Sequence, residues 1–436
     1  MVPEELIRSF ARAVTAPAPQ PFVPGKTLVP VAGAAVPGVT YGAEEIENLL
    51  DVAASFHLTA GKWHDKLEHD LADWYGVKYA RLVNSGSSAN LIAVAALMSP
   101  LLGDRALTAG DEVITVAAAF PTTVAPIIRL GLMPVFVDVT LPDYNVDVTR
   151  LGEAYSSRTR AVMLAHTLGS PFNLDAVRAF CRDRDLFLIE DNCDAAGSTY
   201  RSQKTGTFGD LATLSFYPAH HMTTGEGGAV LTNDSKLAKA VTSLRDWGRD
   251  CWCAPNKDNT CGHRFGWKLG SLPEGYDHKY CYSHLGFNLK MTDMQAAVGC
   301  AQLARLDHFC AARRENWAFY QGALADLDEI LIRPTYLPAA DPSPFGFLVT
   351  LHKNAPISRG DFVAALETRR IQTRPLFAGN LTRHPAMAGA RYALVSPLAW
   401  TDVAANRAFW IGVAPGLTQA MKDWVVESFH EIARGR

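Results

Sequence analysis

The chain has little excess charge of either sign and no long uninterrupted apolar run. Its 41 Lys and Arg residues face 44 Asp and Glu residues, a formal charge of −3, so neither nucleic acid nor an anionic membrane is favoured as a partner. No apolar run reaches the roughly 18 residues of a membrane-spanning helix. Residues 1–6 carry acids where a secretory signal carries basic residues. We therefore expect a cytoplasmic protein.

Cysteine is also sparse, with eight in 436 residues. In a chain of this kind that number favours reduced thiols or metal ligands over a disulfide framework. Hydrophobic residues make up 48% of the sequence, enough to bury a sizeable core. The length suggests one large and one smaller domain, or two to three average domains.

Apolar strand-like runs alternate with helical periods over most of the chain. Strands are predicted at residues 80–83, 112–116, 134–139, 160–166, 186–191 and 211–216, and helices at 87–98, 122–130, 174–182 and 235–247. This alternation predicts an α/β fold with a mostly parallel sheet flanked by helices. A helical stretch over 291–324 leads to a strand at 345–351 and a helix at 359–368.

The predicted organisation has three parts. Residues 1–40 form an arm that begins with an amphipathic helix at 4–14. Residues 41–305 form a large domain with a polar, cysteine-bearing loop at 251–261. Residues 306–436 form a small α+β domain.

Two segments have the composition of a cofactor site. Asn84-Ser85-Gly86-Ser87-Ser88-Ala89-Asn90 follows a strand and opens a helix, where free N–H groups and the helix dipole favour a phosphate. Ser215-Phe216-Tyr217-Pro218-Ala219-His220-His221-Met222-Thr223-Thr224-Gly225-Glu226-Gly227-Gly228 follows another strand and combines hydroxyl, imidazole and glycine. Taken alone, a serine at a helix start is more often only a cap.

The second segment resembles the cofactor-lysine segment of the sugar aminotransferases that use pyridoxal phosphate, the DegT/DnrJ/EryC1/StrS family. His220 stands at the lysine position. Imidazole cannot form a lasting Schiff base as a lysine amine does, so we expect a non-covalently held cofactor, most simply pyridoxamine phosphate (PMP, the amine form of PLP). The resemblance implies the aspartate-aminotransferase-like fold, fold type I.

The resemblance also implies roles for individual residues. Gly86, Ser87 and Ser215 would hold the phosphate, Phe120 would stack on the ring, and Asp191 would pair with the pyridinium nitrogen. Asn288 would reach the phosphate of a neighbouring subunit, which implies at least a homodimer with shared active sites.

Departures from ordinary aminotransferases match the hexulose 3-dehydrases of this family. Asp194, Tyr217 and Phe345, together with His220, form the set found there. His220 is suited to moving a proton at working pH. His166, Arg374 and Arg383 lie in segments that resemble the nucleotide-sugar pocket.

Four cysteines form the remaining signal: Cys193, Cys251, Cys253 and Cys261, with gaps of 57, 1 and 7 residues. Four thiolates can ligate a [2Fe-2S] cluster, a [4Fe-4S] cluster or a tetrahedral zinc, and the spacing alone selects none of them. The pattern resembles that of the family's iron-sulfur 3-dehydrases, which implies [2Fe-2S].

The implied substrate is a nucleotide-linked 4-keto-6-deoxyhexose, CDP-linked first and dTDP-linked as the alternative. The implied reaction removes the C3 hydroxyl in 3,6-dideoxysugar biosynthesis, with electrons from an NADH-dependent flavin and iron-sulfur reductase. Two other interpretations stay open: a cluster-free dehydratase or aminotransferase with structural zinc, and an inactive nucleotide-sugar binder.

Overall fold

The computed structural model describes residues 4–16, 21–33, 36–253 and 257–435. Parts of the predicted arm, residues 1–3, 17–20 and 34–35, lie outside these ranges. The first described element is α1 (Glu4–Thr15), close to the expected helix.

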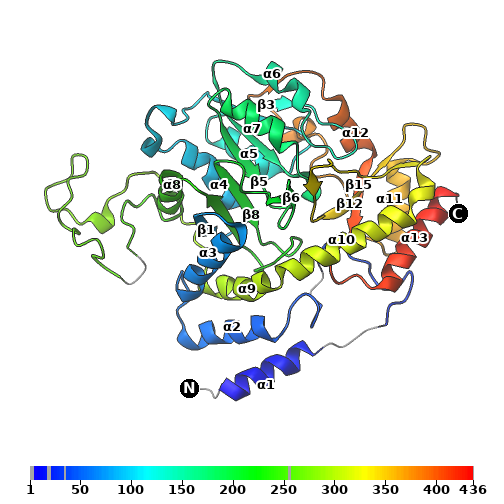
Figure 1. The fold of residues 1–436 in the computed structure, drawn as a ribbon, viewed down its shortest axis with the longest axis horizontal. Coiled ribbons are helices and arrows are strands. Elements are labelled where there is room, and N and C mark those ends of the chain that lie inside the picture. Colours follow the sequence, from blue (N-terminus) through cyan, green and yellow to red (C-terminus); the bar gives the residue numbers. More distant parts are fainter. Residues whose placement is uncertain (1–3, 17–20, 34–35, 254–256, 436) are drawn as a thin grey trace.

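An eight-stranded sheet forms the centre of the molecule (Figure 1). Its order is β1 (Tyr79–Val83), β9 (Gly228–Thr232), β8 (Leu211–Ser215), β5 (Phe187–Asp191), β4 (Thr159–Ala165), β2 (Glu112–Val116), β3 (Met133–Val137) and β14 (Ala393–Leu394). Only β9 runs antiparallel to its neighbours; the other pairs are parallel. β2, β5 and β9 are buried at every position, as expected for strands covered by helices on both faces. The mostly parallel sheet is confirmed.

The helices of this part of the chain follow the strands closely. They are α2 (Ala43–Ser55), α3 (Lys62–Tyr75), α4 (Gly86–Leu97), α5 (Pro121–Arg129), α6 (Leu151–Ala154), α7 (Leu174–Arg182), α8 (Ser235–Arg245) and α9 (Asp293–Ala304). The Ser85 hydroxyl caps α4 by accepting a hydrogen bond from the Ser88 N–H. At the start of α9, Thr292 and Gln295 form a capping box.

The C-terminal part is built on a four-stranded antiparallel sheet, β10 (Leu331–Ile332), β12 (Gly346–Leu351), β15 (Ala408–Gly412) and β13 (Thr373–Arg374). It is flanked by α10 (Leu306–Ala323), α11 (Arg359–Thr368), α12 (Ala399–Arg407) and α13 (Gln419–Ala433). The helical stretch expected at 291–324 is two helices, because the chain breaks between α9 and α10 at Arg305. The domain boundary near 305 stays a prediction.

Several elements were not predicted from the sequence. The helices α2, α3, α12 and α13 depend on packing against distant parts of the chain, and β9 is a short strand at the end of the glycine-rich segment. β14 is the least predictable, since two residues of the C-terminal part complete the edge of the large sheet beside β3.

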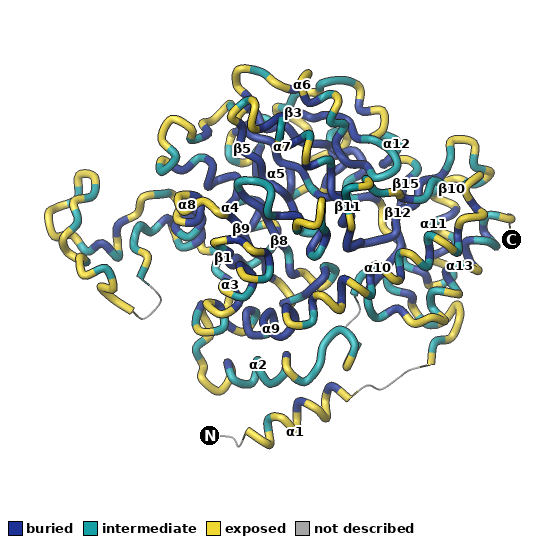
Figure 2. The backbone as a smooth tube through the Cα atoms, viewed as in Figure 1, coloured by how far each residue is buried: buried dark blue, intermediate teal, exposed yellow. Residues whose placement is uncertain are grey.

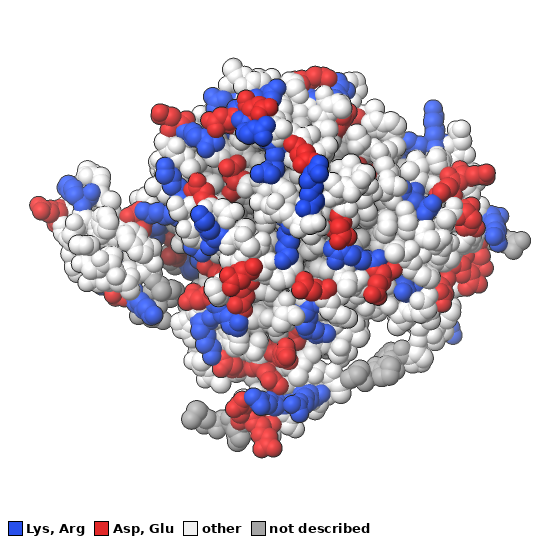
Figure 3. Space-filling view, viewed as in Figure 1, with Lys and Arg blue, Asp and Glu red and all other residues white. Residues whose placement is uncertain are grey.

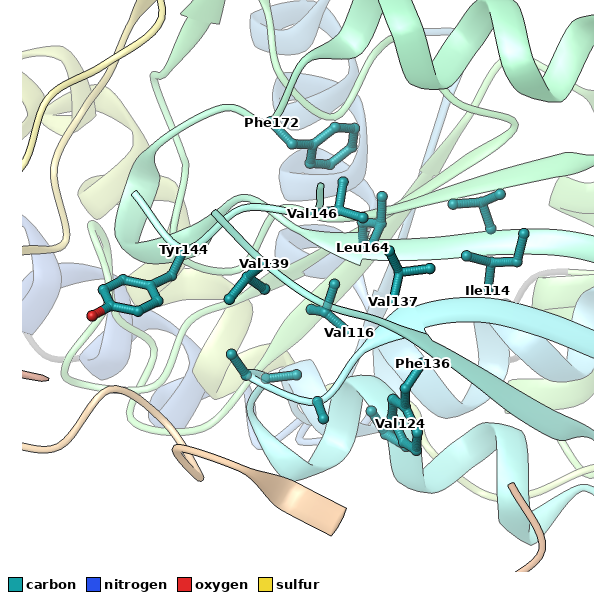
Figure 4. Close-up of a cluster of buried hydrophobic side chains, with 14 of the residues drawn as sticks. Ile114, Val116, Val124, Phe136, Val137, Val139, Tyr144, Val146, Leu164 and Phe172 are labelled. Carbon is teal, nitrogen blue, oxygen red and sulfur yellow. The ribbon is translucent and has the colours of Figure 1, made fainter. Parts of the chain in front are cut away.

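The hydrophobic core is continuous between the two parts of the chain. The cluster in Figure 4, which includes Val116, Phe136 and Phe172, fills the space beside the sheet. The same cluster contains Phe345 and Trp410 from the C-terminal part. Figure 2 shows the buried backbone concentrated along the central sheet.

A long excursion of the chain, residues 248–286, extends from the end of α8 away from the body; we call it the projecting loop (Figure 1). Both ends of the loop meet in a narrow neck: the Trp247 N–H donates to the Phe287 carbonyl at 2.6 Å and the Phe287 N–H donates to the Leu244 carbonyl at 2.6 Å. The loop therefore leaves and re-enters the fold at nearly one point.

Charged side chains of both signs are interspersed on the face seen in Figure 3. Among the described residues, no helix is long and apolar enough to cross a membrane.

Candidate active site

A cavity of about 540 Å³ opens at the carboxyl ends of the parallel strands. This edge is where ligands bind in open α/β sheets. Ten of the predicted site residues lie in the lining of this cavity, and they are Gly86, Ser87, Phe120, Asp191, Asp194, Ser215, Tyr217, His220, Phe345 and Arg374. Cys193, predicted as a metal ligand, also lines it.

The N-terminus of α4 forms a cradle for an anion. Gly86 lies so close to Ser215 that an added Cβ would stand 2.4 Å from the Ser215 Cβ. Glycine therefore lets the helix end approach the strand, and the Ser87 and Ser215 hydroxyls line the same space. N–H groups at a helix N-terminus together with two hydroxyls fit a phosphate.

Asp191 ends β5 with its carboxylate held in place. Oδ2 accepts hydrogen bonds from Asn90 Nδ2 at 2.8 Å and from Thr123 Oγ1 at 2.7 Å. Thr213 donates to Asn90 Oδ1 at 2.6 Å, which fixes the amide orientation. Asp191 is 5% exposed. A buried, oriented carboxylate in this place fits the partner that a pyridinium nitrogen requires.

His220 and Asp194 form a pair beside that carboxylate. The His220 Nδ1 lies 3.3 Å from the Asp194 Oδ1, and both side chains are largely buried. Burial raises the pKa of Asp194, and the nearby His220 opposes the shift. An imidazole oriented by a carboxylate is the arrangement of a general acid or base. None of the described residues that line the cavity is a lysine.

Arg313 of α10 supports the His220 segment from behind. Its guanidinium donates to the carbonyls of Ala219 at 3.2 Å, His220 at 3.1 Å and Phe345 at 3.1 Å. The side chain is fully buried, and burial lowers the pKa of Arg313 to about 10. One residue of the C-terminal part thus joins the backbone of three residues that line the cavity.

Aromatic rings form the walls of the cavity. Phe345 lies 5.1 Å from the His220 ring and 5.3 Å from Trp410, centroid to centroid. Phe120 contacts Phe377 edge-on at 6.5 Å. Phe120 and Tyr217 are about half exposed, at 53% and 52%, so they stand at the mouth.

Three of the residues predicted to bind cofactor or substrate lie outside the lining. His166 is fully buried with its Nε2 3.0 Å from Glu190 Oε2 and its ring stacked on Phe172, so in this structure it is part of the core. Arg383 is largely exposed and pairs with Asp402. Asn288 pairs its backbone with Asp246 and accepts a hydrogen bond from Lys290, outside the cavity of its own chain.

The predicted four-cysteine set is not assembled within the chain. Cys251, Cys253 and Cys261 line one small void in the projecting loop, whereas Cys193 lines the active-site cavity. Burial and the neighbouring Asp191 raise the pKa of Cys193 well above its usual value. Among the described residues, no group of three or more His, Cys, Asp or Glu side chains stands close enough to hold a metal ion. Residues 254–256 of the predicted loop lie outside the described ranges.

Sequence analysis missed the residues that hydrogen-bond the predicted site residues and keep them in position. Asn90 lies in the predicted phosphate-binding segment at 84–90, and a single asparagine in the apolar run of α4 is a signal that could have identified a buried hydrogen bond. Arg313 had no such signal, because its role depends on how α10 packs against a distant loop.

The sheet, the anion cradle and the buried carboxylate together define a fold type I pyridoxal-phosphate enzyme, and comparison with known proteins agrees. The chain belongs to the DegT/DnrJ/EryC1/StrS aminotransferase family, whose model matches residues 39–430.

Relatives in this family include two that cover nearly all of the chain. The lipopolysaccharide biosynthesis protein RfbH of Salmonella typhimurium is 50% identical, over 98% of this chain and 96% of that protein. The dTDP-4-dehydro-2,6-dideoxy-D-glucose 3-dehydratase of Saccharopolyspora spinosa is 49% identical, over 98% and 90%. The solved E. coli GDP-4-keto-6-deoxy-D-mannose-3-dehydratase with bound hydrated PLP aligns with a TM-score of 0.81 at 27% identity, over 92% of this chain and 99% of that one.

Proposed function

We propose that this chain is a PMP-dependent 3-dehydratase that removes the C3 hydroxyl of a nucleotide-linked 4-keto-6-deoxyhexose. The observation that carries the proposal is the His220–Asp194 pair at the position where an aminotransferase needs lysine. The 49% identity to a 3-dehydratase supports the same reaction.

The residues of the cavity fit PMP. When bound, PMP supplies an amine for the C4 ketone and a ring that accepts electrons. Gly86, Ser87 and Ser215 would hold its phosphate, and Asp191 would keep the ring nitrogen protonated. His220 would move a proton at the C4′ carbon of the cofactor, with Asp194 setting the orientation of the imidazole.

Substrate binding would use the mouth of the cavity. Arg374 lines it and could pair with the diphosphate. Phe120 and Tyr217 are exposed there, which leaves room for a second copy of the chain to cover them and to supply Asn288. We propose a homodimer with shared sites on this basis. CDP is our first proposal for the nucleotide, and the similarity to a dTDP-sugar enzyme supports dTDP as the alternative.

Proton exchange at PMP tests the proton transfer that must precede elimination. The PMP-loaded protein is incubated in D₂O with either the CDP- or the dTDP-linked 4-keto-6-deoxyglucose, and recovered PMP is examined by NMR. We expect deuterium at C4′ only with the true substrate, and none with the His220→Asn variant. Formation from L-glutamate of an amino sugar that keeps its C3 hydroxyl would instead identify an aminotransferase, because transamination also moves a proton at C4′ but does not break the C3–O bond.

We further propose that the reaction is reductive, with two electrons from NADH through a separate flavin and iron-sulfur reductase, and that the projecting loop holds a [2Fe-2S] centre. Support comes from the three thiols around one void. The separation of Cys193 from them favours a second candidate, a cluster-free dehydratase with zinc in the loop. Iron and acid-labile sulfide analysis of anaerobically purified protein decides, since a cluster requires about two of each per chain.

A further inference from the structure

Two backbone hydrogen bonds join a segment of the C-terminal part to the loop between β2 and α5. The Ala378 N–H donates to the Ala119 carbonyl at 3.3 Å, and the Leu381 N–H donates to the Ala117 carbonyl at 3.0 Å. The two parts of the chain are therefore held together at the carboxyl end of β2, the edge of the sheet at which the active-site cavity opens.

Directly beside these bonds, Phe120 and Phe377 lie against each other in the cavity lining. Their ring centroids are 6.5 Å apart and their planes are 78° apart, which is a favourable edge-to-face arrangement. Within the described part of the chain, this is the only ring contact that Phe120 makes. Because Phe120 is about half exposed, the contact with Phe377 restrains a side chain that otherwise has room to turn.

Phe377 has a backbone conformation that a phenylalanine rarely adopts. Its φ is +47°, in the left-handed region where a bulky residue is a genuine outlier. Glycine would adopt this conformation without strain. Strained backbone persists where the surrounding structure enforces it, and it is concentrated at functional sites. An aromatic ring at a position whose backbone favours glycine therefore indicates a use for that ring.

The Phe120 backbone is tied to the buried carboxylate that fits a pyridinium nitrogen. Its carbonyl accepts a hydrogen bond from the Thr123 N–H at 3.0 Å, and the Thr123 hydroxyl donates to Asp191 Oδ2 at 2.7 Å. The position of Phe120 is thus set by the start of α5 and the orientation of its ring by Phe377. A ring that is already ordered before a ligand binds loses less freedom on binding, which favours affinity.

We propose that Phe377 is a positioning residue for the cofactor: its ring, held on a strained backbone, keeps Phe120 in place for stacking on PMP. The stacking of Phe120 on PMP rests on the proposed function, whereas the contact between the two rings does not. The C-terminal part of the chain thereby contributes to cofactor binding through Phe120.

The experiment measures the dissociation constant of PMP by equilibrium dialysis, and the circular dichroism that the protein induces in the absorption band of bound PMP. Urea unfolding of the cofactor-free protein measures the stability of each variant. The variants are Phe377→Ala, Phe377→Gly, Phe377→Tyr, Phe120→Ala and the double variant that combines Phe120→Ala with Phe377→Ala.

Tyr392→Ala is the matched control. Tyr392 also lies in the C-terminal part and packs against the same hydrophobic cluster as Phe377. It meets Phe136 edge-on, with centroids 5.6 Å apart, but it does not line the cavity. The control therefore removes a ring contact of the same kind away from the cofactor.

We expect Phe377→Ala to weaken PMP binding about two- to tenfold, the range of one aromatic pair, and to reduce the induced dichroism. Phe377→Tyr should restore both, because it keeps the ring. Phe377→Ala should have no further effect once Phe120 is alanine, because Phe377 acts through Phe120. Phe377→Gly should bind PMP as weakly as Phe377→Ala but unfold at a higher urea concentration, since glycine relieves the strain. Tyr392→Ala should lower stability alone.

Wild-type affinity and dichroism in Phe377→Ala and Phe377→Gly would overturn the inference. Equal losses in Tyr392→Ala, or an undiminished further loss in the double variant, would overturn it as well. Phe377→Gly keeps the test decisive if Phe377→Ala does not fold. The proposed function fails by a different result, a wild-type protein that binds PMP but leaves the C3 hydroxyl of the sugar in place. The affinities of the variants would then still decide the role of Phe377.

Discussion

Replacing Arg313 by methionine should destabilise the protein and impair catalysis together. The change leaves the Ala219, His220 and Phe345 carbonyls without their donor, at about 2 kcal/mol each or about 6 kcal/mol in all. The change also removes a buried positive charge. Burial lowers the pKa of Arg313 to about 10, which corresponds to a cost of about 3 kcal/mol that the methionine variant does not carry. The expected net loss in free energy of unfolding is about 3 kcal/mol, because methionine fills most of the space.

The neighbouring Arg314 provides a matched control. It also donates to carbonyls, those of Pro342 at 2.9 Å and Gly197 at 2.8 Å, but its side chain is 33% exposed, so water can replace it. Arg314→Met should lose less than about 1 kcal/mol in urea unfolding. Only Arg313→Met should also lower kcat more than it raises KM, because it frees the backbone of His220. Equal stability and equal kcat in the two variants would refute the reasoning.

Three further changes test the cavity. His220→Lys should let the chain bind PLP covalently, seen as a cofactor-sized mass increase after borohydride reduction; no increase would mean that residue 220 does not reach the aldehyde. Burial raises the pKa of Asp194, so the folded state favours the neutral carboxyl. The contribution of Asp194 to the free energy of unfolding is therefore fully present below the ordinary carboxyl pKa and is lost as pH rises through the raised pKa. Asp194→Asn should therefore be more stable than the wild type at pH 7, with the difference shrinking towards pH 4, while C4′ exchange falls; an unchanged unfolding midpoint at pH 7 would contradict this. Gly86→Ala forces a Cβ to 2.4 Å from that of Ser215 and should weaken PMP binding at least tenfold, about 1.4 kcal/mol, in equilibrium dialysis; wild-type affinity would place the phosphate elsewhere.

Short sequence patterns predicted most of the elements at the carboxyl ends of the strands, where the cofactor would bind. The strand before Asp191 and the Ser85 cap of α4 depend on residues within a few positions of each other, so the sequence pattern carries them. The resemblance then supplied His220 and Phe345, which the structure brings into one cavity.

Other features depend on contacts that no local pattern encodes. His166 lies in a segment that resembles the nucleotide-sugar pocket, and Glu190 on the adjacent strand β5 holds its imidazole in the core. The resemblance implies Cys193 as a metal ligand, and in the structure it lines the active-site cavity whereas the loop thiols line a separate void. Strand order and helix packing decide both outcomes.

Because the two ends of the projecting loop meet in the narrow neck, the loop is structurally an insertion into the fold. Gly248 and Gly286 approach so closely that a Cβ on Gly286 would stand 2.3 Å from the Gly248 nitrogen, and the backbone bonds beside them close the fold whether or not a long excursion lies between. A segment joined in this way can be acquired, lengthened or lost in descent without disturbing the sheet. Changes in the length of the projecting loop should therefore leave the cofactor cavity intact.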